Sequence, residues 1–136
     1  MSYAVFLSQY DEPAKVVQCT GDVLQECHRL MDCDIVELIP GYPDRLPKGY
    51  KALCDENYWG TSQFINPLAS WINGADDCGS AIMGNVVVLK TIQTEEGEDL
   101  AFMTEEEATA LAEVLNTDFE TKYDLVVSTV MRSMMQ

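Results

Sequence analysis

In two short segments near the start of the chain, successive side chains fall into two alternating sets, as they do on the two faces of a strand. Residues 3–9 and residues 15–19 both show this pattern, which is typical of β-strands. An Asp-Glu-Pro sequence at residues 11–13 lies between them and favours a turn. The pattern therefore predicts a β-hairpin at the beginning of the chain.

The period then changes to that of a helix. Apolar residues at positions 23, 24, 27, 30 and 31 fall on one side of a helix spanning residues 21–31, and either Thr20 or Asp22 can cap it. Residues 35–39 return to strand character and stop at a Pro-Gly pair. Residues 41–49 contain two Gly and two Pro and are expected to form a loop.

The middle of the chain contains two further strands and a short helix. Residues 50–55 predict a strand that ends in a turn at residues 57–60. Asn66 followed by Pro67 is typical of a helix start, because Asn caps free amides and Pro fits the first helical position. Residues 82–92 are rich in Val and predict a strand at the centre of the sheet. The buried side of the short helix would consist of Leu68, Trp71 and Ile72.

A charged turn at residues 95–99 and a short apolar run at residues 100–103 come next. Thr104 and Glu107 have the spacing of a capping box, in which each side chain accepts a hydrogen bond from the backbone amide of the other residue. We therefore predict a helix over residues 104–116. Its apolar face would be formed by Ala108, Leu111, Ala112 and Leu115.

Apolar residues continue at helical spacing to the end of the chain. This spacing favours a further helix, although the β-branched residues between positions 126 and 130 leave a strand as the alternative. Such a terminal helix can pack on its own domain or pair with a second copy of the chain. The residues that would form a homodimer contact are Phe119, Tyr123, Val127, Val130, Met131 and Met134.

Together these elements predict an α+β fold. The sheet would be mixed or antiparallel with about five strands, flanked by the helices at residues 21–31 and 104–116. The 136 residues, of which 47% are hydrophobic, suit one domain with a full core. We assign this domain to residues 1–116 and the added C-terminal helix to residues 117–136.

The formal net charge of −15 narrows the range of partners. Binding to nucleic acid without sequence preference needs cations, and so does adsorption to anionic membranes, so both are disfavoured. Between Glu95 and Asp124 there are eleven Asp and Glu residues and one Lys. This segment can be a solvated face that aids solubility, or a surface that binds a basic partner. The acidic face would consist of Glu95, Glu96, Glu98, Asp99, Glu105, Glu106 and Glu113.

A second candidate site combines basic and aromatic residues. Core packing explains the aromatic residues in the middle of the chain, but in a pocket they could stack on a base while nearby cations bind phosphate. The ligand would be a small nucleotide. The residues of this alternative site are Arg45, Lys48, Lys51, Asn57, Tyr58, Trp59, Asn66 and Trp71.

The remaining residues do not indicate catalysis, a metal or a cofactor. The five Cys residues include no Cys-x-x-Cys pair, so we expect reduced and mostly buried thiols rather than disulfides or a zinc site. The single histidine, His28, is expected on a helix surface. The start of the chain lacks the features of a signal peptide, and no apolar run is long enough to span a membrane. A cytoplasmic protein that is not an enzyme is the expectation.

Short phrases in the sequence resemble a family of small proteins from phages and bacterial mobile elements, catalogued as domain of unknown function family 3846. They are CDIVELI at residues 33–39, LCDEN at residues 53–57, NPLA at residues 66–69 and IMGNVVV at residues 82–88. The likeness covers about residues 3–116. The chain departs from the family pattern at Asp32 and Cys33, where a glycine pair is missing, and in the segment after Asp118.

The resemblance implies a phage accessory factor, of a kind that blocks host defences by binding, and it brings no catalytic residues. Together with the acidic segment, it leads to the hypothesis of a non-enzymatic anti-defence protein. This protein would bind a host protein stoichiometrically through its acidic face, in the host cytoplasm. The alternative hypothesis is a sponge that sequesters a small nucleotide immune signal.

Overall fold

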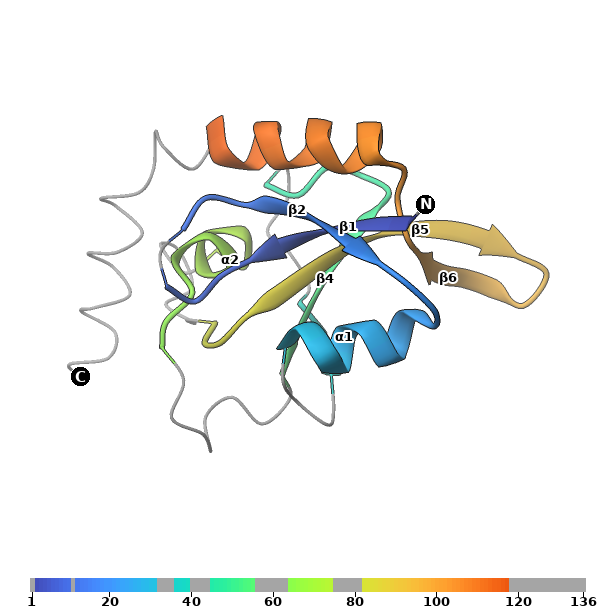
Figure 1. The fold of residues 1–136 in the computed structure, drawn as a ribbon, viewed down its shortest axis with the longest axis horizontal. Helices are drawn as coiled ribbons and strands as arrows, with labels where there is room; N and C mark the ends of the chain where they lie inside the picture. Colours follow the sequence, from blue (N-terminus) through green and yellow to red (C-terminus); the bar gives the residue numbers. More distant parts are fainter. Residues whose placement is uncertain are drawn as a thin grey trace.

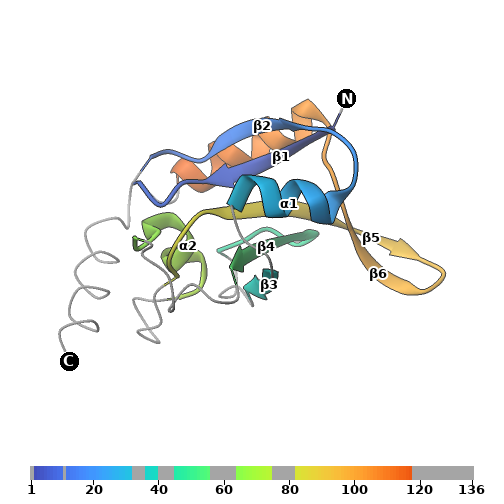
Figure 2. The ribbon, with the colours of Figure 1, turned by 60° about the horizontal axis from the view of Figure 1, so that its bottom comes forward.

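A computed structural model of the chain describes residues 2–10, 12–31, 36–39, 45–55, 64–74 and 82–117. The elements labelled in Figures 1 and 2 are β1 (Ser2–Leu7), β2 (Lys15–Cys19), α1 (Val23–Met31), β3 (Val36–Ile39), β4 (Tyr50–Asp55), α2 (Pro67–Ile72), β5 (Val86–Thr94) and β6 (Gly97–Ala101). A further helix follows β6 at residues 105–117.

The strands form one antiparallel sheet in the order β2-β1-β5-β4-β3. The sixth strand, β6, pairs with the second half of β5, where residues 90–94 lie opposite residues 97–101. β1 pairs with the first half of β5, at residues 86–88. An isolated bridge between Tyr3 and Met103 joins the start of β1 to the chain that follows β6. The α+β prediction with an antiparallel sheet is confirmed.

Different helices cover the two faces of the sheet (Figures 1 and 2). On one face, Cys27 and Met31 of α1 share a core with Leu53 of β4 and Leu89 of β5. The other face is covered by α2 and the helix of residues 105–117. The two helices predicted to flank the sheet therefore lie on opposite faces of it.

β5 is buried on both sides over its first four residues. Val86 and Val88 belong to the core beneath α2, whereas Val87 and Leu89 belong to the core beneath α1. A strand with two buried faces has no solvent side, which explains why its apolar residues run without alternation. Its position between β1 and β4 confirms that it is central.

Asn66 joins three parts of the fold at a point with no exposure to solvent. Its Oδ1 accepts a hydrogen bond from the backbone amide of Ala69 at 3.1 Å, which caps α2 as predicted. Its Nδ2 donates to the carbonyl oxygens of Leu7 at 2.8 Å and Gly84 at 2.9 Å. One amide therefore fixes the start of α2, the end of β1 and the chain entering β5.

Two predicted boundaries were wrong. The strand predicted for residues 82–92 begins only at Val86, because Met83 instead makes an isolated bridge with Ile65. The charged turn predicted for residues 95–99 is shorter: Glu95 and Glu96 form the turn, and β6 starts at Gly97. Glu98 and Asp99 are therefore strand residues. Glu and Asp have a low intrinsic preference for strands, but pairing with β5 supplies the backbone hydrogen bonds that hold these residues in a strand.

The predicted helix caps are confirmed. Asp22 caps α1, since its Oδ2 accepts a hydrogen bond from the backbone amide of Gln25 at 3.2 Å. Thr104 and Glu107 form the expected reciprocal pair, with distances of 3.1 Å and 2.9 Å from backbone amide to side-chain oxygen. The predicted turn at residues 57–60 and the helix predicted after residue 117 lie outside the described residues.

The junction at Asn66 can be tested by two substitutions. Asn66→Ala removes the cap and leaves two buried carbonyl groups without a donor, so we expect unfolding to require about 3 kcal/mol less free energy. Asn66→Ser retains a capping oxygen and should lose about 1 kcal/mol less than Asn66→Ala. Urea unfolding followed by circular dichroism measures both values. Equal losses in the two variants would contradict a capping role for this residue.

Candidate functional site

The acidic residues at the turn between β5 and β6 lie on an arm. The β5–β6 hairpin projects beyond the rest of the sheet (Figures 1 and 2). All residues from 92 to 99 are exposed. We call the four carboxylates of this arm the hairpin acidic group: Glu95, Glu96, Glu98 and Asp99.

The shape of this arm has a local cause. Gly97 has a φ of +119°, which L side chains rarely adopt, so the turn requires glycine at this position. The hydroxyl of Thr94 donates a hydrogen bond to the carbonyl of Gly97 at 2.9 Å and accepts one from the amide of Glu96 at 3.3 Å. These bonds close the turn and hold Glu95 and Glu96 at its tip.

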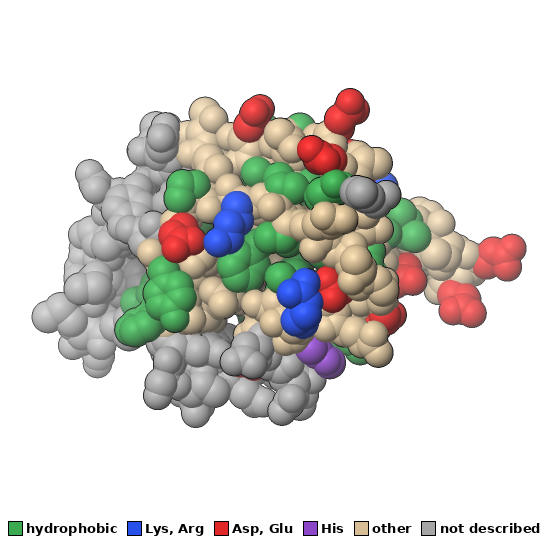
Figure 3. All heavy atoms as spheres, in the orientation of Figure 1, with side chains coloured by type: hydrophobic (Ala, Val, Ile, Leu, Met, Phe, Trp, Pro, Cys, Tyr) green, Lys and Arg blue, Asp and Glu red, His purple; other side chains and the backbone are tan. Residues whose placement is uncertain are grey.

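The helix of residues 105–117 carries a second set of carboxylates, Glu105, Glu106 and Glu113, which we call the helix acidic group. All three are exposed. Glu106 and Glu113 are seven residues apart and therefore lie on the same outward side of the helix, about two turns from each other. Figure 3 shows acidic side chains both along this helix and at the end of the hairpin. The predicted acidic face therefore consists of two groups on different elements.

Within the part of the chain that the structure describes, none of these seven carboxylates forms an ion pair. Two of them make other contacts. Asp99 accepts a hydrogen bond from the amide of Leu100 at 2.8 Å. Glu105 accepts a hydrogen bond from the hydroxyl of Tyr3, and this bond, more than burial, raises the pKa of Tyr3. Most of the negative charge therefore faces solvent without compensation from a described cation.

Glu107 lies among these residues but has a structural role. Its Oε1 accepts the hydrogen bond from the amide of Thr104 and lies 3.1 Å from Nζ of Lys90 on β5. The bond from the Thr104 amide is the main reason that the pKa of Glu107 is lowered, and the bond from Lys90 lowers it further. This side chain therefore caps its helix and ties that helix to the central strand.

The structure uses several residues of the alternative nucleotide site for packing. Asn66 is fully buried and bonded as described above, and Trp71 is a core residue. The guanidinium of Arg45 donates a hydrogen bond to the carbonyl of Trp71 at 2.8 Å and lies over its ring, 5.4 Å from the centroid. Both Asn66 and Trp71 are therefore buried in the core, and the structure gives them packing and capping roles.

The structure describes two further residues of that site. Lys48 is exposed in the turn before β4, and Lys51 is half-buried within β4. The remaining three residues of the nucleotide site, Asn57, Tyr58 and Trp59, lie outside the described residues. So do all six residues of the predicted homodimer contact: Phe119, Tyr123, Val127, Val130, Met131 and Met134.

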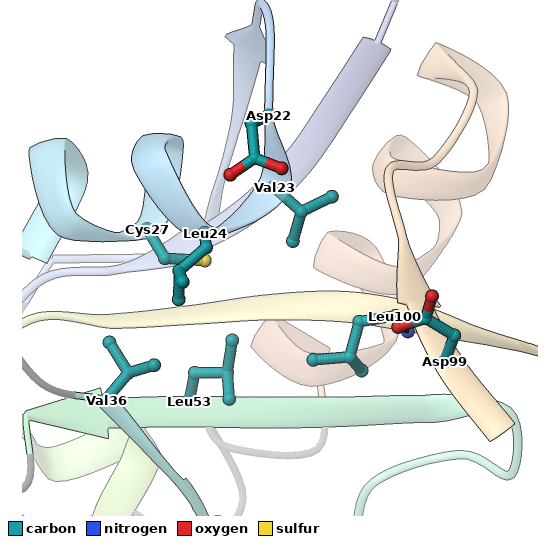
Figure 4. Close-up of a pocket in the computed structure, with 8 residues that line it drawn as sticks. All are labelled: Asp22, Val23, Leu24, Cys27, Val36, Leu53, Asp99 and Leu100. Carbon is teal, nitrogen blue, oxygen red and sulfur yellow. Dashed lines mark hydrogen bonds between the residues drawn. The ribbon is translucent and has the colours of Figure 1, made fainter.

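A pocket between α1 and the sheet was not predicted. Its volume is about 340 Å³, and apolar side chains of α1 face those of β3 and β4 across it (Figure 4). Sequence reasoning missed it because the apolar stripe of α1 predicts only burial, not incomplete filling of the space beneath the helix. The lining residues are Asp22, Val23, Leu24, Cys27, Val36, Leu53, Asp99 and Leu100.

The cysteines and other candidate ligands add little further chemistry. Cys19, Cys27 and Cys54 are buried, and burial is the main cause that raises the pKa of the Cys19 thiol. Across the described ranges, no three His, Cys, Asp or Glu side chains are grouped so as to hold a metal ion. None of the helices in those ranges is long and apolar enough to cross a bilayer.

The role of Glu107 predicts a pH dependence. Because its pKa in the folded protein is lowered from 4.5, the ionised form stabilises the fold above that value, and this contribution disappears as the pH falls through the lowered pKa. Glu107→Gln should therefore be less stable than the wild type at pH 7, by at most about 1 kcal/mol because solvent screens this partly exposed pair, with the gap closing towards pH 3. Thermal unfolding across this pH range measures the gap.

The matched control for this prediction is Glu106→Gln. It removes one negative charge from the neighbouring position, without a cap or an ion pair in the described part, and should change the stability at pH 7 by less than about 0.5 kcal/mol. A gap between Glu107→Gln and the wild type that stays constant down to pH 3 would contradict the assignment.

Comparison with protein-family models, curated proteins and solved structures finds no match for this chain. Function therefore has to be inferred from the geometry and charge of the chain itself. The feature that most distinguishes its described surface is the hairpin acidic group, because four carboxylates within five residues project from the sheet on a strand pair.

Proposed function

We propose that this protein is a non-enzymatic binding protein whose acidic surface docks on a basic surface of a partner protein. The observation that carries the proposal is the hairpin acidic group, which is exposed at the end of a projecting arm and forms no ion pair with a described residue. The helix acidic group would extend the contact along the top of the sheet in Figure 1.

Electrostatics favour such an arm as a docking element. Carboxylates held close together repel one another in the free protein, and a cationic partner surface relieves this repulsion. Complementary charge also speeds the encounter of two proteins and orients them before close contact. Because the carboxylates are exposed, the interaction is expected to weaken as added salt screens it.

Solubility alone accounts less well for this distribution of charge. Residues 1–94 carry twelve acidic and six basic residues, whereas residues 95–136 carry eleven and two. Eight of these eleven acidic residues lie on the β5–β6 hairpin and the helix of residues 105–117. Solubility depends on net charge and on interspersed charges, and it does not require carboxylates to be gathered on two elements. A contact with a basic surface, in contrast, requires several carboxylates close together.

The resemblance to the phage and mobile-element family supports a host protein as the partner. In this proposal the chain acts as an anti-defence or accessory factor in the host cytoplasm, and it blocks its target stoichiometrically by covering a basic surface. The proposal needs no cofactor and no chemical step. The nucleotide sponge remains a prediction, but Asn66 and Trp71 no longer support it, since both are buried.

The test starts with capture from host lysate at low ionic strength, followed by purification of the captured protein and measurement of its Kd. We expect Glu96→Gln combined with Glu98→Gln to weaken the complex about fivefold, since each exposed charge pair contributes a few tenths to one kcal/mol. The wild-type Kd should rise steeply between low and physiological salt.

The control removes the same charge elsewhere, by Glu12→Gln combined with Glu37→Gln. Glu12 is exposed before β2 and Glu37 lies on β3, both away from the hairpin. This pair should change the Kd less than twofold, which is within the scatter expected for charges outside a contact. Failure to capture any protein at low salt, or equal effects of the two double variants, would remove the main support for the proposal.

A further inference from the structure

The pocket between α1 and the sheet has two chemically different parts. Leu24 and Cys27 of α1 face Leu53 of β4 and Val36 of β3, and together they form an apolar part (Figure 4). Asp22 and Asp99 line the pocket on the side of β6, at the N-terminal end of α1. A molecule that fills the pocket therefore meets apolar surface at one part and carboxylates at the other.

The apolar part is open to solvent. Leu24 is 51% exposed although it belongs to the apolar stripe of α1, whereas Cys27 beneath it is 1% exposed. With a volume of about 340 Å³, the pocket lies at the small end of the range for ligand sites, which is about 300 to 1,000 Å³. This space suits one large apolar side chain rather than a whole cofactor.

Backbone amides hold both carboxylates in place, and the negative charge of the carboxylates favours a cationic ligand group. Asp22 accepts the hydrogen bond of the Gln25 amide, and Asp99 accepts that of the Leu100 amide. Each carboxylate is therefore fixed at the pocket, with acceptor capacity left for another donor.

We propose that this pocket receives an apolar side chain of a partner polypeptide in which Lys or Arg residues flank that side chain. The inference rests on the proposed function and specifies how the partner is recognised: the apolar side chain enters beneath Leu24, and the flanking cations meet Asp22 and Asp99. Charge complementarity selects this occupant. Fatty acids and nucleotides carry the same sign of charge as these carboxylates and would be repelled.

The two kinds of contact have separate roles. The carboxylates supply attraction that reaches beyond contact distance but is screened by salt, and it does not distinguish one basic segment from another. The pocket supplies burial of apolar surface, which is insensitive to screening and selects segments that have an apolar residue at the right place. The pocket therefore gives specificity to a surface that otherwise binds any cationic chain.

The test uses two defined peptides on the intact protein. One is acetyl-Lys-Lys-Phe-Lys-Lys-amide, and the other has Ser in place of Phe. At low salt we expect the Phe peptide to bind about tenfold more tightly, since a buried aromatic side chain contributes at least a factor of this size. Backbone amide signals of Leu24 and Cys27 in nuclear magnetic resonance spectra should shift more with the Phe peptide than with the Ser peptide, because only the Phe side chain enters the apolar part.

Two substitutions separate the pocket from the general charge. Leu24→Ser should weaken the Phe peptide about fivefold and leave the Ser peptide unchanged, because it removes one apolar wall. Asp22→Asn retains a capping oxygen for α1 and should weaken both peptides. The matched control is Val114→Ser on the helix of residues 105–117, because Val114 is 44% exposed and that helix covers the opposite face of the sheet. It should change neither Kd.

The outcomes distinguish this inference from the function on which it rests. If the Phe and Ser peptides bind equally, or if Leu24→Ser changes nothing while Glu96→Gln with Glu98→Gln weakens both peptides, then the pocket is not used and the acidic surface still binds cations. If neither peptide binds at low salt, both proposals are overturned. If phenethylamine binds as tightly as the Phe peptide, the occupant is a small cation and the polypeptide assignment is wrong.

Discussion

The buried amide of Asn66 is the interaction on which the arrangement of the sheet depends. Its two donors bind carbonyl groups at the end of β1 and just before β5, and its oxygen caps α2. Ser70 adds a second link, since its hydroxyl exchanges hydrogen bonds with both backbone groups of Ile82. The segment entering the central strand is therefore fixed by neutral buried groups that are hydrogen-bonded within the core.

Because the first half of β5 is fixed in the sheet, its second half extends beyond the neighbouring strands. β1 runs alongside β5 only at residues 86–88, and β4 pairs with it at residues 87–90. The rest of β5 extends beyond both neighbours, and only β6 accompanies it. The projecting arm is therefore a consequence of strand lengths and of a register held at the Asn66 end. Its carboxylates reach solvent because no other described element covers residues 92–99.

The described carboxylates differ in whether they have partners within the fold. Glu26 is a buried carboxylate, and it is held by the guanidinium of Arg29 and the amide of Thr20, with its pKa lowered mainly by Arg29. Glu107 accepts a hydrogen bond from the amide of Thr104 and forms an ion pair with Lys90. The hairpin acidic group, in contrast, has no cationic partner in the described part. This difference separates carboxylates that stabilise the fold from carboxylates available for binding.

The amino-acid sequence by itself determined the features that depend on neighbours along the chain. The spacing of Thr104 and Glu107 predicted the capping box, Asn66 before Pro67 predicted the start of α2, and the unbroken apolar residues of β5 predicted its central position. These predictions succeeded because the interacting groups lie within one turn of a helix or along one strand, where spacing specifies geometry.

Only the tertiary structure decided the features that depend on residues far apart in the chain. β6 has a sequence that disfavours strands, and it forms because β5 offers it an unpaired edge beyond β1. Asn66 has bonding partners 18 and 59 residues away, so its burial could not be deduced from its role as a cap. The pocket beneath Leu24 likewise depends on how closely α1 approaches the sheet, and periodicity identifies which side of a helix is buried but not how well the space beneath it is filled.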